Sequence, residues 1–218
     1  MSAKRCRKRF AISRQNRTII VLLCLLIALI VGWLDRTNAR PPHAPQTKTV
    51  SKVKPGDIEK YQGKTFTVVY TVDGDTIDIN IPDDQYDHTR IRLWGIDTPE
   101  TKAPNQPVGY FGPEASEFTK QMTRGKRVKI YISEKQTRDK YDRLLAYVQF
   151  EDGSFLNELL LSDGFAYADR RFKHQYYNKY LQLESAARRD KNGLWANVKR
   201  EQFPEWLQRI EPDLLKNE

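Results

Sequence analysis

The sequence predicts an α+β fold, mainly β: a five-stranded Greek-key barrel of the OB type with three helices, preceded by one N-terminal transmembrane helix. Two observations predict it. Short strand-like and helical segments follow one another in the order three strands, helix, two strands, helix, helix. Ahead of them lies an uninterrupted apolar segment, residues 19–34.

Length and composition fit one ordinary globular domain with appendages. The chain has 218 residues, of which 39% are hydrophobic, and a formal net charge of +9. Seven basic residues and no acid lie in residues 1–17, so the excess charge is mostly N-terminal. Bulk charge is therefore poor evidence for a nucleic-acid-binding face on the main domain, although a basic chain often raises that expectation.

The apolar segment IIVLLCLLIALIVGWL, residues 19–34, is predicted to anchor the protein in a membrane. It lies at the short limit of a spanning helix, which needs about 17–25 residues, and Trp33 suits the membrane interface. A cleaved signal peptide and a buried soluble helix are the alternatives. The basic residues 1–18 should stay in the cytoplasm, which puts the rest of the chain on the far side.

Beyond the anchor, three regions are expected. Residues 35–60, rich in proline and polar residues, are predicted to be a linker. Residues 61–198 should form the folded domain and residues 199–218 a C-terminal tail. The two cysteines, Cys6 and Cys24, precede the domain, so no disulfide can stabilise it.

Five segments of the domain have strand character, and the second, third and fourth alternate apolar and polar residues as half-buried strands do. They are Thr65–Val72, Thr76–Ile81, Arg90–Ile96, Arg127–Ser133 and Leu144–Phe150.

Three helices are predicted between and after these strands. Gly112-Pro113 opens the first, because proline suits the first helical turn. Ser154 is the expected N-cap of the second, which Gly164 ends. Residues 177–190 form the third.

Acidic residues gather where two of the predicted strands begin or end. Asp73-Gly74-Asp75 has the composition of a hairpin turn, yet its second acid lies where the chain re-enters a strand. Thr98-Pro99 suits a helix start, which leaves Asp97 and Glu100 unexplained. Like charges crowded together would repel unless a cation lay between them. Taken singly, the charged DKYDR segment, residues 139–143, is typical of a solvated loop.

Together these segments resemble the staphylococcal nuclease family. The matching motifs are VDGDT, RLWGIDTPET, YFGPEAS, DKYDRLLAYV, LNELLLSDGFAYA and GLW, in order between about Thr65 and Trp195.

The resemblance implies roles for nine residues. Calcium would be held by Asp75, Asp97 and the carbonyl of Thr98, with Asp73 acting near the metal through water. Arg92, Glu100 and Arg143 would be catalytic, and Lys140 and Tyr141 would hold a terminal phosphate of a bound nucleotide.

Known chemistry is consistent with these roles. Calcium prefers hard oxygen ligands in irregular geometry, a carboxylate can accept a proton from water, and arginine matches phosphate oxygens. The resemblance implies a calcium-dependent hydrolase that leaves 3′-phosphates on both DNA and RNA, since attack by water needs no 2′-hydroxyl. No obligate protein partner is evident, and a monomer is expected.

Asp142 departs from the family pattern, which commonly has glycine there. The hypothesis is that its carboxylate pairs with Arg143 and weakens the charge that Arg143 presents to substrate. His43, His88 and His174 are expected to be exposed, and their spacing fits no zinc site.

Two other classes of protein fit the same fold. One is an OB-type binding module without catalysis, and the other is a membrane-anchored structural protein. Neither needs the full set of acids and arginines, so that set favours an enzyme.

Overall fold

The computed structural model describes residues 53–101 and 107–215, which belong to one compact unit, residues 45–218. Its strands are β1 (Lys64–Asp73), β2 (Thr76–Ile79), β3 (Thr89–Leu93), β4 (Ile96–Asp97), β5 (Arg127–Ile132), β6 (Leu144–Gln149) and β7 (Tyr167–Ala168). Its α-helices are α2 (Asp57–Tyr61), α3 (Gly112–Thr123), α4 (Leu156–Ser162), α5 (Tyr177–Arg189) and α6 (Glu205–Ile210), with short 3-10 helices at Gly193–Ala196 and Arg200–Gln202.

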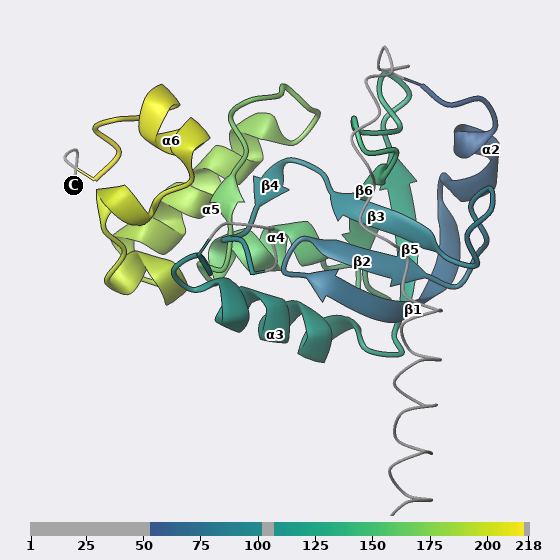
Figure 1. The fold of residues 1–218 in the computed structure, drawn as a ribbon, viewed down its shortest axis with the longest axis horizontal. Helices are drawn as coiled ribbons and strands as arrows, with labels where there is room; N and C mark the ends of the chain where they lie inside the picture. Colours follow the sequence, from purple (N-terminus) through teal and green to yellow (C-terminus); the bar gives the residue numbers. More distant parts are fainter. Residues whose placement is uncertain (1–52, 102–106, 216–218) are drawn as a thin grey trace, which may run out of the picture. The chain divides into compact units, whose positions relative to one another are not determined.

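Five strands close into a barrel in the order β1-β2-β3-β6-β5, which confirms the predicted barrel (Figure 1). β3 and β6 pair in parallel, and the remaining pairs are antiparallel. Arg92 lies opposite Thr76 on β2 and opposite Leu145 on β6. This register brings the start of β2, the end of β3 and the segment before β6 to the same part of the barrel.

The prediction for the second strand is only partly right, because all four residues of β2 are buried. Asp78 points away from the barrel interior yet stays covered, since Arg90 on β3 reaches it with Nε at 2.9 Å and Nη2 at 3.0 Å. Alternation in β3 and β5 is confirmed. A half-buried pattern in sequence does not reveal an ion pair that covers the polar face.

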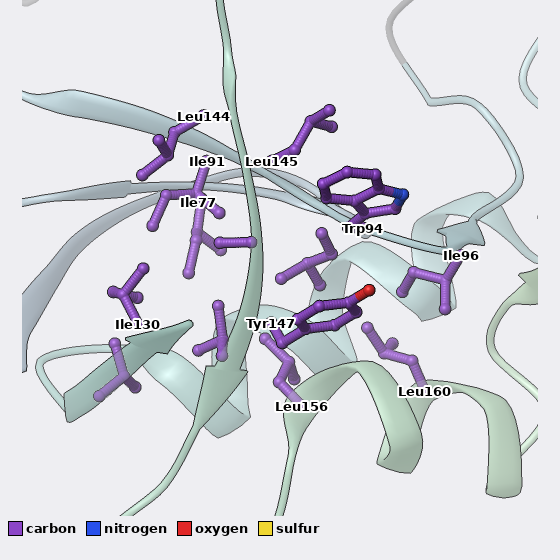
Figure 2. Packing of buried hydrophobic residues seen from close by; sticks show 14 of the residues in the cluster. Ile77, Ile91, Trp94, Ile96, Ile130, Leu144, Leu145, Tyr147, Leu156 and Leu160 are labelled. Carbon is purple, nitrogen blue, oxygen red and sulfur yellow. The ribbon is translucent and has the colours of Figure 1, made fainter. Parts of the chain in front are cut away.

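Apolar side chains from every barrel strand fill the interior (Figure 2). Ile77, Ile91 and Ile130 are fully buried. Trp94 and Tyr147 stack with centroids 6.2 Å apart and an interplanar angle of 9°. Full burial of one such side chain stabilises the fold by about 1.5–3 kcal/mol, so this interior makes a rigid base for the site.

The predicted third strand does not run on to Ile96. Gly95 adopts φ 82°, and a Cβ there would lie 2.4 Å from the ring of His174. The chain therefore leaves the barrel at Gly95, and β4 pairs with β7 in a separate two-stranded sheet. This break places Asp97 on β4, beside the barrel rather than in it.

His174 is half-buried, so the expectation that it is exposed is wrong; His88 is exposed as predicted. The Nδ1 atom of His174 lies 3.0 Å from the hydroxyl of Tyr147, and its ring packs against Tyr180 at 5.0 Å. Close approach to Gly95, far away in sequence, is the reason for this burial.

The three predicted helices are present as α3, α4 and α5, but Ser154 does not cap α4. Phe155 occupies the N-cap position, without a side-chain cap bond. The hydroxyl of Ser154 instead donates to Asp152 at 2.6 Å, because the preceding turn offers a closer acceptor.

Parts of the predicted linker and tail are structured. Asp57 in α2 and Asp83 both pair with buried Arg138, which fastens α2 to the domain. At the other end, residues after 198 form α6 and bury Phe203, Trp206, Leu207 and Leu214 in a second apolar cluster with Tyr167, Ala187, Leu194, Trp195 and Val198. The predicted anchor, residues 19–34, lies outside the described residues, and the helices within 53–101 and 107–215 are all too short or too polar to span a bilayer.

Candidate active site

Asp75, one of the predicted metal ligands, lies in the turn between β1 and β2. Asp75 is 8% exposed, and Thr98 comes so close to the turn that a Cβ on Gly74 would lie 2.7 Å from its Oγ1. The backbone N–H of Thr98 donates to Asp75 Oδ2 at 3.0 Å. Glycine is therefore needed at position 74 to let β4 and its following residue approach Asp75.

Arg92 lies between the two predicted metal ligands. Its Nη1 pairs with Asp75 Oδ2, and its Nη2 lies 2.5 Å from Asp97 Oδ1. Burial disfavours the charge on Arg92, but Asp75 and then Asp97 outweigh it, so the pKa of Arg92 is raised. Two carboxylates, one from the β1–β2 turn and one from β4, thus converge on one cationic group.

Asp73 and Glu100 add negative charge beside this pair. Asp73 accepts hydrogen bonds from Thr101 Oγ1 at 2.7 Å and from the N–H of Gly74 at 2.8 Å. Burial, together with the nearby charges of Asp75 and Glu100, raises the pKa of Asp73 to about 6. Glu100 is exposed, next to the residues 102–106 that the structure does not describe.

The segment before β6 brings the second arginine to the same place. Arg143 Nη1 lies 3.5 Å from Thr76 Oγ1, which in turn donates to Asp75 Oδ1 at 2.9 Å. Tyr141 is 39% exposed, and its ring lies 4.8 Å from Lys140 Nζ and 5.4 Å from Arg143 Cζ. The structure therefore brings all nine predicted residues to one region, with the aromatic and basic side chains at its rim.

Comparison of the sequence with known proteins matches the chain to a family. The model of the family described as "Staphylococcal nuclease homologue" matches residues 90–197. The thermonuclease of Staphylococcus hyicus is 36% identical over 66% of this chain and 83% of its own length. The thermonuclease of Staphylococcus intermedius is 33% identical over 80% and 95%. Endonuclease YncB of Bacillus subtilis (strain 168) is 35% identical over 60% and 61%.

The chain belongs to the staphylococcal nuclease family. It is a nuclease, a hydrolase of nucleic acids, and the non-catalytic alternatives do not apply to it.

In this nuclease Asp139, not Asp142, holds Arg143. Arg143 Nε lies 2.7 Å from Asp139 Oδ2, whereas the Asp142 carboxylate lies 3.7 Å from Lys54 Nζ. The hypothesis that Asp142 weakens Arg143 is therefore wrong. Asp142 has φ 62°, a left-handed conformation that turns its side chain away from its neighbour and that glycine adopts without strain.

Sequence reasoning missed three residues that contact the site: Asp139, Arg171 and Trp206. Arg171 Nη2 lies 3.2 Å from Asp97 Oδ1, and the indole N–H of Trp206 donates to Asp97 Oδ2 at 2.7 Å. The acid four residues before Arg143 could have indicated Asp139. Trp206 lies 109 residues from Asp97 and matches none of the quoted motifs, so the sequence offers nothing that points to it.

The donor atoms suit a hard cation such as calcium. Asp75 and Asp97 supply carboxylates that already meet at one positive group. Thr98 Oγ1 is buried beside them and has no hydrogen-bond partner in the part of the chain that the structure describes. Within the same residues, no three His, Cys, Asp or Glu side chains gather in a metal-binding group, and Arg92 pairs with both carboxylates.

Proposed function

We propose that this nuclease is calcium-dependent and sugar-non-specific, cutting DNA and RNA to products with 3′-phosphates. The observation that best supports it is the convergence of the Asp75 and Asp97 carboxylates on the guanidinium of Arg92, with Arg143 close by at Thr76. Calcium takes several oxygen ligands in irregular geometry, which suits two carboxylates, a carbonyl and water.

Asp75, Asp97 and the carbonyl of Thr98 would hold the ion, with Asp73 nearby. When bound, calcium would polarise a phosphoryl oxygen and help to position water. Glu100, exposed at the edge of the site, orients that water or accepts its proton. The water oxygen would form the new bond to phosphorus while its proton passes to Glu100. The bond from phosphorus to the 5′-oxygen would break, and that oxygen would take a proton from solvent to become the 5′-hydroxyl, so the phosphate stays on the 3′ side.

Arg92 and Arg143 neutralise charge that develops on the phosphoryl oxygens. Guanidinium groups match two such oxygens at once, and they contribute most where charge increases in the transition state. Lys140 and Tyr141, exposed at the rim, bind a terminal phosphate. No group is needed for the ribose 2′-hydroxyl, so sequence and sugar preference should be weak.

The test is hydrolysis of single-stranded DNA, duplex DNA and RNA by the full-length chain in detergent. A fragment that began at residue 61 would lack Asp57 and so break its ion pair with Arg138. Calcium should support cleavage, magnesium should support it poorly, and a calcium chelator should abolish it. Products should accept a kinase-added 5′-phosphate without prior dephosphorylation. Chelator-resistant cleavage would refute the metal role, and 5′-phosphorylated products would refute the cleavage direction.

We also propose that residues 19–34 anchor a monomeric nuclease outside the cytoplasm. The support is the apolar length of the segment and the basic residues before it. Protease added to intact cells, or to spheroplasts where there is an outer membrane, should release an active fragment of about domain size. Protection until the membrane is lysed would contradict this orientation, and release without protease would favour a cleaved signal peptide.

A further inference from the structure

Asp97 receives donors from two directions. On the barrel side, Arg92 Nη2 approaches Oδ1 at 2.5 Å. On the other side, Arg171 also reaches Oδ1, while Oδ2 accepts the indole N–H of Trp206 at 2.7 Å. Arg171 follows β7, and Trp206 belongs to α6, beyond the residues that the family model matches.

The position of Trp206 is fixed by packing. Its side chain is 6% exposed in the second apolar cluster, where Phe203 and Leu207 are also buried. The guanidinium of Arg171 lies over its ring, 4.7 Å from the centroid. A buried indole N–H usually finds an acceptor, and here that acceptor is a proposed metal ligand.

Arg171 is held in turn. Its Nε and Nη2 pair with Asp169 at 2.9 Å and 2.8 Å. Asp169 is itself fixed to the chain next to Asp97. Its backbone N–H donates to the carbonyl oxygen of Gly95, two residues before Asp97, at 2.9 Å. Arg171 is therefore tied through Asp169 to the same short sheet as Asp97, whereas Trp206 is held by the second apolar cluster.

We propose that α6 is part of the metal site, with Trp206 as a positioning residue that fixes the carboxylate of Asp97 for calcium. The inference rests on the proposed calcium role of Asp97. Donors behind a ligating carboxylate fix its orientation, and their loss typically lowers metal affinity by about 10–100-fold. The C-terminal segment thus acts on the ion through Asp97, without contacting substrate.

The test compares Trp206→Phe with a matched control, Trp195→Phe. Both residues are 6% exposed in the same cluster, but Trp195 Nε1 has no hydrogen-bond partner within the described residues. Calcium binding to the full-length chain is measured by titration calorimetry, and turnover is measured at low and at saturating calcium. Trp206→Phe should raise the Kd for calcium by about tenfold or more, so its loss of turnover should be larger at low calcium than at saturating calcium. Trp195→Phe should keep the wild-type Kd.

A second readout leaves Trp206 in place. Because its N–H bonds to a ligand oxygen, the part of the tryptophan emission that wild type has and Trp206→Phe lacks should change when calcium is added, since Trp33, Trp94 and Trp195 emit in both proteins. Asp75→Asn should abolish this change. An unchanged or tighter Kd in Trp206→Phe, with normal binding by wild type and loss in Asp75→Asn, would overturn the role of Trp206 alone. Absence of calcium binding by wild type would overturn the proposed metal site as well.

Discussion

The carboxylate of Asp139 accepts three hydrogen bonds, and its Oδ2 lies 2.7 Å from both Nε and Nη2 of Arg143. Its Oδ1 accepts the backbone N–H groups of Tyr141 and Arg143, each at 2.9 Å. One carboxylate therefore sets both the conformation of the loop and the direction of the Arg143 side chain. In the nuclease, this segment is a structured part of the site and not a solvated charged loop.

Asp139→Asn should lower kcat by about tenfold. The amide oxygen can still accept from the loop backbone, but the charged acceptor for Arg143 is lost, which removes on the order of 1.5 kcal/mol of orienting interaction. The kcat of the variant is measured by steady-state cleavage of single-stranded DNA at saturating calcium. A normal kcat would show that Asp139 has no part in positioning Arg143.

Asp142→Gly should leave kcat within about twofold of wild type and raise the free energy of unfolding by up to about 1 kcal/mol. The physical reason is the φ of 62° at this position, combined with a carboxylate that faces Lys54 and not Arg143. Urea denaturation and steady-state kinetics test the two parts. An increase of several-fold in kcat would restore the idea that Asp142 restrains Arg143.

Arg92→Ala should combine a loss of turnover with a calcium-dependent loss of stability. Its removal leaves Asp75 and Asp97 facing each other, at a cost of roughly 2–3 kcal/mol, less than the 3–5 kcal/mol typical of a fully buried pair. Calcium should recover most of this loss, because it would supply the missing positive charge. The measurement is Tm with calcium and with a chelator.

Glu100→Gln is the matched comparison for Arg92→Ala. Because Glu100 is exposed, the Tm of the Glu100→Gln protein should equal that of wild type with or without calcium. Its kcat should fall by about 10²–10³-fold. Two variants that both lose turnover would then differ in stability. If Arg92→Ala kept its Tm in chelator, Arg92 would not be the group that balances the two carboxylates.

Local patterns in the sequence predicted the barrel strands well, because alternation in β3 and β5 reflects burial of one face. The motifs placed Asp75, Arg92 and Asp97 together because each lies at the end of a strand or just beyond it. The burial of β2 on both faces could not be predicted, since it depends on Arg90 reaching across to Asp78 from the next strand.

Contacts between distant segments were beyond sequence reasoning. Asp57 and Arg138 are 81 residues apart, and each alone is typical of a solvated surface. Trp206 and Asp97 are likewise distant in sequence, 109 residues apart. Such pairs form only after the barrel, β7 and α6 have been placed, and no periodicity encodes them.

Arg138→Leu should destabilise the fold by about 3–5 kcal/mol, since it removes the buried partner of both Asp57 and Asp83 and leaves Asp83 only the longer contact with Lys54 Nζ at 3.6 Å. Arg138 Nη1 also donates to the carbonyl of Asp142 at 3.1 Å, so the loop that holds Arg143 should loosen. Lys120→Ala, which removes an exposed ion pair with Glu117, is the control and should leave stability unchanged within error. Equal urea midpoints for the two variants would contradict a structural role for Arg138.

His174 should make stability depend on pH. Burial is the main reason that its pKa falls from 6.5 to about 4; Lys173 lowers it further, while Asp169 opposes the shift. Tyr147 and the α5 residues Tyr177 and Tyr180 face the ring, and all three are neutral in the acid range.

The direction of the pH effect follows from the pKa of His174, which is 6.5 in the unfolded chain and about 4 in the folded protein. Above pH 6.5 the ring is neutral in both the folded and unfolded states, so protonation of His174 takes nothing from the free energy of unfolding there. Between pH 6.5 and about 4 the unfolded chain binds a proton that the folded chain does not, so stability falls as pH falls. At pH 5 the loss should be on the order of 1–2 kcal/mol relative to pH 7. His174→Asn keeps a group at the position of Nδ1 for Tyr147 but does not titrate. The difference in unfolding free energy between wild type and His174→Asn should therefore narrow or reverse as the pH is lowered from 7 to 5, whereas parallel curves over that range would show that His174 does not couple protonation to folding.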